Sequence, residues 1–95
     1  MKTATYMISY DLNKPGQDYA GLYKAIKQFN WCHPVESTWL IVTTKTCVEI
    51  RDLLKPHLDA NDELLVTKLE GDWASYGLSP TVTEWLNKNV VWLPR

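Results

Sequence analysis

The run Ser-Thr-Trp-Leu-Ile-Val-Thr-Thr at residues 37–44 decides the fold of this chain, because it is the most strongly β-prone stretch in the sequence. Branched and aromatic side chains of this kind favour the pleated, half-buried surface of a sheet. We therefore predict a central strand here. The preceding residues 31–35 include Pro34, which has no backbone N–H to give to a ladder, so we predict only a short strand or a ragged edge there.

Two more strands are predicted on either side of this centre in the sequence. Residues 5–12 are rich in aromatic and β-prone side chains, and the turn-forming Asn-Lys-Pro-Gly at 13–16 ends them. Residues 63–69 form a similar run, which follows the chain-breaking residues 59–62 and ends at Glu70-Gly71.

The intervening segments have helical spacing. Asp18 is a good N-cap for a helix whose apolar residues recur at three- and four-residue intervals, namely Tyr19, Leu22, Tyr23, Ile26 and Phe29. Thr46 followed three residues later by Glu49 is a capping box for a second helix. Because a proline interrupts helical hydrogen bonding, Pro56 should kink this helix or end it near Leu54.

Together these elements give the order βαββαβ, from which we predict an α+β protein with a ferredoxin-like sandwich. The core covers residues 5–70 of a single domain spanning residues 1–95. A C-terminal extension, residues 71–95, begins with a loop and continues into a short helix capped by Ser79-Pro80. Its apolar tail, residues 90–95, is expected to dock as an extra strand or against a neighbouring subunit.

Composition narrows the class of protein. A chain of 95 residues with 45% hydrophobic and 22% charged residues is typical of one folded domain. Its formal net charge of −1 lacks the basic excess of generic nucleic-acid or membrane-surface binders. The longest apolar runs have four residues, too few for a membrane span, and no secretory signal precedes the first strand. We therefore expect a cytoplasmic protein with no membrane partner, in which Cys32 and Cys47 are free thiols.

Few residues offer chemistry. Nucleophile elbows, phosphate-binding glycine loops and zinc-helix motifs are absent from the sequence. A zinc site could in principle use two cysteines and two histidines, but their spacing is not that of zinc ligands. These residues are Cys32, His33, Cys47 and His57. Asp11 remains, at the exit of the first strand, where a carboxylate can hold a hard cation. Spacing alone favours the alternative, in which Asp11 caps its own turn before Pro15-Gly16.

Several short patterns resemble a known family. Tyr-Asp-Leu at 10–12, Pro-Gly-x-Asp-Tyr at 15–19, Ser-Thr-Trp-Leu at 37–40 and the segment 59–69 resemble the small CRISPR-associated subunit of the spacer-integration complex and its relatives, the Cas2-like superfamily. The similarity covers roughly residues 5–70 and is closest to the SinR-like branch; the VapD-type toxin ribonucleases are relatives. No arginine follows Asp11, and Glu36 stands near a position where the CRISPR subunit often has glutamine.

This resemblance implies a ferredoxin-like homodimer that acts on or scaffolds DNA or RNA. The strand-one aspartate of the family falls on Asp11, and a serine of its valine-polar-x-serine strand pattern corresponds to Ser37. The two Asp11 carboxylates of a dimer are then expected to share one Mg²⁺ or Mn²⁺, which would activate a water for attack on a phosphodiester. Ser37 or the backbone amides of residues 13–16 would position a phosphate oxygen.

Three function classes remain open from the sequence. A metal-dependent endonuclease requires an exposed Asp11 near its dimer mate. A catalytically inactive scaffold for protein or nucleic acid requires only the dimer surface. The third class is a toxin- or antitoxin-like regulator of a mobile element. Clustering of five cations on one face would favour nucleic-acid binding; these are Lys14, Lys24, Lys27, Lys45 and Arg51.

Overall fold

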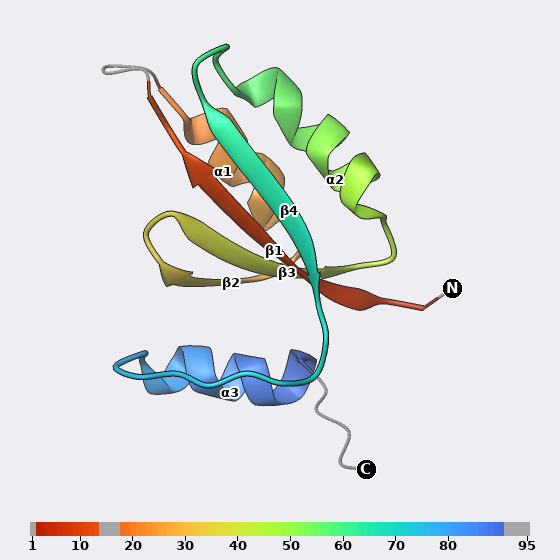
Figure 1. Ribbon diagram of the computed structural model, residues 1–95, viewed down its shortest axis with the longest axis vertical. Helices are drawn as coiled ribbons and strands as arrows, with labels where there is room; N and C mark the ends of the chain where they lie inside the picture. The colour runs from red at the N-terminus through yellow and green to blue at the C-terminus, as the bar shows by residue number, and fades with distance from the viewer. Residues whose placement is uncertain (1, 14–17, 91–95) are drawn as a thin grey trace.

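A computed structural model describes residues 2–13 and 18–90 of the chain (Figure 1). Four strands and three α-helices follow one another in the order β1 (Ala4–Asp11), α1 (Ala20–Lys27), β2 (Asn30–Val35), β3 (Thr38–Thr43), α2 (Cys47–Leu54), β4 (Glu63–Leu69) and α3 (Pro80–Asn89). A 3₁₀ turn, Lys55–His57, lies between α2 and β4. The predicted α+β class is confirmed, and the strands and helices of the core follow one another in the predicted order along the chain.

The four strands form one antiparallel sheet in the order β2-β3-β1-β4. The prediction of a central strand at 37–44 is confirmed, because β3 pairs with β2 on one side and with β1 on the other. Strand β2 is an edge strand, as Pro34 suggested, and its pairing with β3 shifts register between Cys32 and Val35. The extra residue on β2 is a β-bulge that interrupts the ladder at Pro34.

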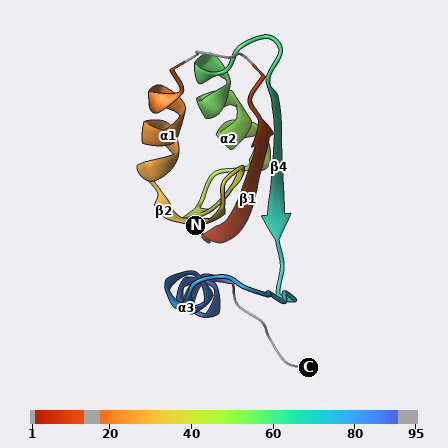
Figure 2. The same ribbon diagram turned by 90° about the vertical axis from the view of Figure 1, so that its left-hand side faces the viewer.

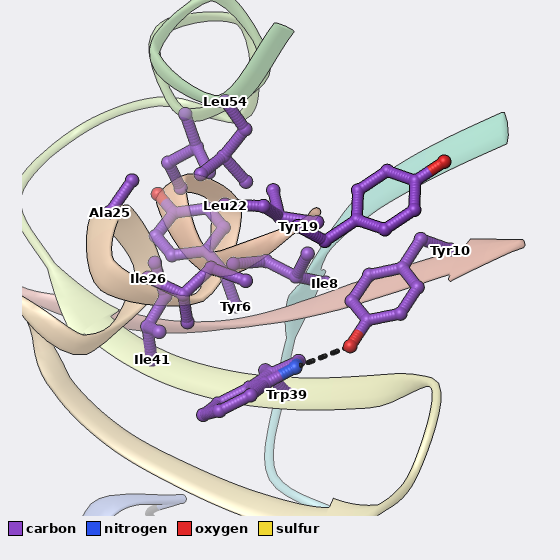
Figure 3. Close-up of a cluster of buried hydrophobic side chains, with 11 residues drawn as sticks. Tyr6, Ile8, Tyr10, Tyr19, Leu22, Ala25, Ile26, Trp39, Ile41 and Leu54 are labelled. Atoms are coloured by element: carbon purple, nitrogen blue, oxygen red, sulfur yellow. Dashed lines mark hydrogen bonds between the residues drawn. The ribbon is translucent and has the colours of Figure 1, made fainter. Parts of the chain in front are cut away.

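Helices α1 and α2 cover one face of the sheet (Figure 2). Because successive side chains of a strand point to opposite faces, Tyr6, Ile8 and Tyr10 of β1 all point toward these helices. Figure 3 shows this first core, in which aliphatic side chains from strands and helices interdigitate. The largest side chains that are fully buried are Ile8, Leu22, Ile26, Ile41, Ile50 and Leu54.

Helix α3 packs on the opposite face of the sheet, at one end of it. The chain leaves β4 through Gly71, whose φ of 63° is one that residues with a Cβ rarely adopt. Leu86 and Val90 then bury against Cys32 and Leu40, which alternate with the residues facing α1 and α2. Half-buried hydrophobic residues surround this second core, namely Met7, Leu69, Trp73, Leu78, Val82 and Trp85.

Two of the predicted helix boundaries are confirmed by their caps. The Thr46 hydroxyl accepts a hydrogen bond from the Glu49 amide at 3.1 Å, and the Glu49 carboxylate accepts one from the Thr46 amide at 2.8 Å. Helix α2 ends at Leu54, and Pro56 lies in the 3₁₀ turn that follows. Helix α3 begins after Ser79, whose hydroxyl accepts from the Val82 amide.

The predicted start of the first helix was wrong by one residue. Tyr19 occupies the N-cap position, and α1 begins at Ala20. The Asp18 carboxylate still accepts from the Ala20 amide, at 2.9 Å. The Tyr19 ring is buried, and its hydroxyl is bound to Asp62, a residue far along the chain.

The C-terminal tail is described only at Val90, which is buried in the second core. The predicted docking of the tail concerns residues 91–95, which lie outside the described residues. Among the helices that the structure describes, none is long and apolar enough to cross a membrane.

Candidate functional site

The candidate metal ligand Asp11 is the last residue of β1. It is exposed, and it alternates with Tyr10, so it lies on the sheet face that α1 and α2 do not cover. No hydrogen bond or ion pair to its carboxylate occurs among the described residues, and the Asp11 carbonyl accepts a long contact from the Asn13 side chain at 3.4 Å. No described residue therefore binds this carboxylate.

A second carboxylate stands next to Asp11. In the antiparallel pairing of β1 with β4, Asp11 lies directly opposite Glu63. Like charges that face each other across two strands repel, so a cation near them would be stabilising. These residues line an open hollow of about 250 Å³ with Ser9, Tyr10, Leu64 and Leu65. The sequence analysis missed Glu63, although antiparallel pairing of residues 5–12 with residues 63–69 would have brought it here.

The turn after Asp11 is held by a hub of hydrogen bonds around Asp62. The Asn13 amide donates to one Asp62 carboxylate oxygen at 2.7 Å, and the Asp59 amide donates to the other at 2.7 Å. The Tyr19 hydroxyl lies 2.8 Å from both oxygens. Three chain segments thus converge on one carboxylate, which fixes the exit of β1 against the start of β4.

This hub corrects one sequence expectation. The Asn13 amide was expected to be free to position a phosphate oxygen, but it donates to Asp62 instead. The other amides of that expectation, at residues 14–16, lie outside the described residues.

Ser37 lies at the same end of the sheet as Asp11. It is an exposed residue of the turn between β2 and β3, and its carbonyl accepts a hydrogen bond from the Tyr10 amide at 3.1 Å. Ser37 is therefore beside the residue that precedes Asp11. The structure therefore places the Ser37 backbone beside the end of β1, without a contact between the Ser37 and Asp11 side chains among the described residues.

An aromatic network stabilises that corner. The Trp39 indole donates to the Tyr10 hydroxyl at 2.8 Å (Figure 3), and the hydroxyl donates in turn to the Glu36 carbonyl at 3.2 Å. The same carbonyl lies 2.9 Å from Nε2 of His33. Burial raises the pKa of Tyr10, because the phenolate would be poorly solvated there. The turn that carries Ser37 is thus anchored from two sides.

Few described side chains of one chain could bind a metal ion together. Within residues 2–13 and 18–90, no group of three or more histidine, cysteine, aspartate or glutamate side chains is arranged to hold a metal ion. Cys32 and Cys47 are free thiols, and burial raises the pKa of Cys32. Asp11 and Glu63 supply oxygen donors of the kind that Mg²⁺ and Mn²⁺ prefer, so they fit such an ion only as part of a set that other groups complete.

The five cations considered in the sequence are spread over several elements. Lys24 and Lys27 lie one turn apart on α1, and both are exposed. Arg51 on α2 is paired with Asp52 at 2.9 Å, and Lys45 lies between β3 and α2. Lys14 lies outside the described residues. Of the four of these cations that the structure describes, only Lys24 and Lys27 lie on the same element.

Comparison with known proteins adds no assignment: no protein-family model matches the chain, and no solved structure matches it significantly.

Proposed function

We propose that this chain is a ferredoxin-like homodimer of the Cas2-like superfamily that acts on or scaffolds nucleic acid. The first candidate activity is that of a divalent-metal-dependent endonuclease with Asp11 of each subunit at its centre. The observation that carries the proposal is the exposed Asp11 carboxylate, which no described residue binds, at a corner that also holds Glu63 and Ser37. The βαββαβ order and the two helices on one sheet face support the ferredoxin-like assignment.

The homodimer is part of this proposal, and the sheet face beside Asp11 supports it. Leu65 lies opposite Ser9 in the register of β1 and β4, and its side chain is 59% exposed. The proposed dimer would cover this leucine, so Leu65 would add buried apolar area to the contact. Two copies packed through this face would bring their Asp11 carboxylates together, so one dimer would supply four carboxylates to a shared ion.

In this proposal each residue has a distinct role. Asp11 and Glu63 hold the ion through carboxylate oxygens, and the Ser37 hydroxyl donates to a phosphate oxygen of the substrate. When bound, Mg²⁺ or Mn²⁺ supplies Lewis-acid activation of water and stabilises the charge that develops on the phosphate. The Asp62 hub and the Tyr10–Trp39 network keep the two sides of the corner in place.

Cleavage assays with Asp11→Asn test the endonuclease. We expect wild-type protein to cleave labelled DNA or RNA only with Mg²⁺ or Mn²⁺, and we expect Asp11→Asn to abolish cleavage while thermal unfolding stays nearly unchanged. Glu63→Gln should reduce the rate, and Asp72→Asn, which changes an exposed carboxylate of the β4–α3 loop, should not. Cleavage by Asp11→Asn at the wild-type rate would refute the endonuclease assignment.

A catalytically inactive scaffold is the second candidate, because residues 2–13 and 18–90 of one chain contain no group of three metal-ligating side chains. It predicts nucleic-acid binding without cleavage at any concentration of Mg²⁺ or Mn²⁺. Light scattering tests the dimer that both candidates share. A species of twice the 11.0 kDa chain mass is expected, and Leu65→Glu should convert it to monomer by placing a charge in the interface.

A further inference from the structure

Two exposed rings lie on the edge strand β2, beside helix α1. Trp31 is 40% exposed, the largest value for any tryptophan that the structure describes, and the neighbouring His33 ring is also exposed. Both residues lie on the α1 side of the sheet, since both rings pack against Trp39, which belongs to the first core. We call Trp31 and His33 the aromatic ledge.

The ledge is rigid because a buried ring supports it. The His33 ring stacks on Trp39 with 3.7 Å between ring centroids and 10° between ring planes, and Trp31 leans on the same indole at 5.3 Å. Trp39 is only 3% exposed, and the Tyr10 hydroxyl holds its indole nitrogen. His33 is fixed further by its contact with the Glu36 carbonyl. Both rings therefore require little ordering when a flat ligand stacks on them.

Positive charge flanks the ledge. The Lys27 ammonium lies over the rings of Trp31 and Trp39, 5.4 Å and 5.8 Å from their centres, so a base that stacks on Trp31 would take the place of this ammonium and leave it free for the adjacent phosphate. Lys24 is one helical turn away. Neither lysine forms an ion pair with a carboxylate in the described residues. Both ammonium groups can therefore bind an anion without first breaking a salt bridge to that part of the chain.

We infer that the aromatic ledge binds single-stranded nucleic acid, with an unpaired base stacked on Trp31 or His33 and adjacent phosphates at Lys27 and Lys24. This inference rests on the proposed function and identifies the form of nucleic acid that the protein contacts. Every base has a flat π-face, and stacked aromatic rings next to cationic side chains are the elements of single-strand binding. In a duplex the base faces are covered by neighbouring base pairs, so a double helix has no free face for the ledge.

The β2 edge itself disfavours a protein strand as the ligand. A β-augmenting peptide needs a continuous row of backbone groups, and the bulge between Cys32 and Val35 with Pro34 interrupts that row. The ring faces and lysine ammonium groups remain as the recognition elements.

The test is binding of fluorescently labelled single-stranded oligonucleotides by anisotropy, in EDTA so that a metal site plays no part. Homopolymeric DNA and RNA of the same length, and a matched duplex, are the ligands. Trp31→Leu keeps an apolar side chain against Trp39 but removes the ring, and Trp31→Phe restores a ring. Lys24→Gln with Lys27→Gln removes the charge. Matched controls are Tyr76→Ala, which removes a fully exposed ring from the β4–α3 loop, and Lys88→Gln on α3.

We expect Trp31→Leu to raise Kd about tenfold, because one base loses its stacking partner, while Trp31→Phe and both controls bind within about twofold of wild type. The double lysine variant should lower the slope of log K against log salt by about 0.7 for each phosphate that the lysines no longer neutralise. A difference between DNA and RNA would show whether the 2′-hydroxyl contributes.

Two results would overturn the inference, and they differ in what they imply for the proposed function. If wild-type protein binds single strands and the ledge variants bind equally well, the ledge is not the binding surface, while the proposed function stands. If wild-type protein binds neither single strands nor duplex in EDTA, the ledge inference is wrong, and the cleavage assay with Mg²⁺ or Mn²⁺ then decides the proposed function separately.

Discussion

The two hydrophobic cores on opposite faces of the sheet differ in how completely their side chains are buried. Under α1 and α2, Ile8, Ile41 and Leu54 have no exposed surface at all. Under α3, Leu86 and Val90 are buried, but the surrounding Trp73 and Trp85 remain partly exposed. Because stabilisation by burial is roughly proportional to the apolar area removed from water, the first core should govern global unfolding. The second should open separately, as a local unit of lower stability.

The largest expected effect comes from truncating each core in turn. Ile41→Ala should lower the free energy of unfolding by about 2–5 kcal/mol, because the tight first core cannot collapse around the cavity. Leu86→Ala should leave the main transition nearly in place and shift only the tryptophan signal of α3. Urea unfolding followed by far-UV circular dichroism and by fluorescence measures both. Equal displacement of the main transition by the two variants would show that the cores unfold as one.

Cys32 reports opening of the second core directly, because α3 covers its buried thiol. We expect slow labelling of Cys32 by a thiol reagent in the native protein, and labelling about tenfold faster in Leu86→Ala, which corresponds to about 1.4 kcal/mol. A Cys47→Ser background isolates the signal. An unchanged rate in Leu86→Ala would mean that the thiol becomes accessible only by global unfolding.

The helix caps offer a smaller and matched comparison. Thr46→Ala and Ser79→Ala each remove one hydroxyl that accepts from a helical amide, and each should cost about 1 kcal/mol. Thr46→Ala should lower global stability, whereas Ser79→Ala should only accelerate Cys32 labelling. Hydrogen exchange of the α2 and α3 amides separates the two outcomes, and a Ser79→Ala effect on α2 would contradict the local character of α3.

The smallest effect concerns pH and the first core. Since burial raises the pKa of Tyr10 in the folded state, the unfolded chain loses this proton first as pH rises. The contribution of Tyr10 to stability is therefore complete below its ordinary pKa of about 10 and declines above it. Unfolding free energies of wild type and Tyr10→Phe between about pH 8 and about pH 11 test this. Parallel decline in both proteins would assign the pH dependence to other groups.

Local signals in the sequence predicted most elements of the fold. The strand at Glu63–Leu69 has the predicted bounds, and the capping box at Thr46 and the stop before Pro56 occur where the pattern placed them. Each of these features depends on residues within one short window. The start of α1 was missed by one residue, at Tyr19, whose burial and bond to the distant Asp62 no local pattern indicates.

The candidate site was less accessible to sequence analysis. Asp11 and Ser37 could be selected one by one, but their shared corner depends on the pairing of β1 with β3. Glu63 joins them only through the register of β1 and β4, because Asp11 and Glu63 are far apart in sequence but lie opposite each other in space. The aromatic ledge depends on a stack of His33 on Trp39 that no local pattern specifies.

The bulged edge of the sheet also limits how copies of this chain can assemble. Pro34 and the register shift in β2 make that edge a poor template for an added strand, whereas β4 pairs without a register shift along its whole length. Strand addition between copies is then restricted to β4. A contact of β4 with β4 would use the same surface on both partners, so strand addition would stop at a pair with two-fold symmetry. The geometry of β2 thus acts against filaments built by strand addition alone.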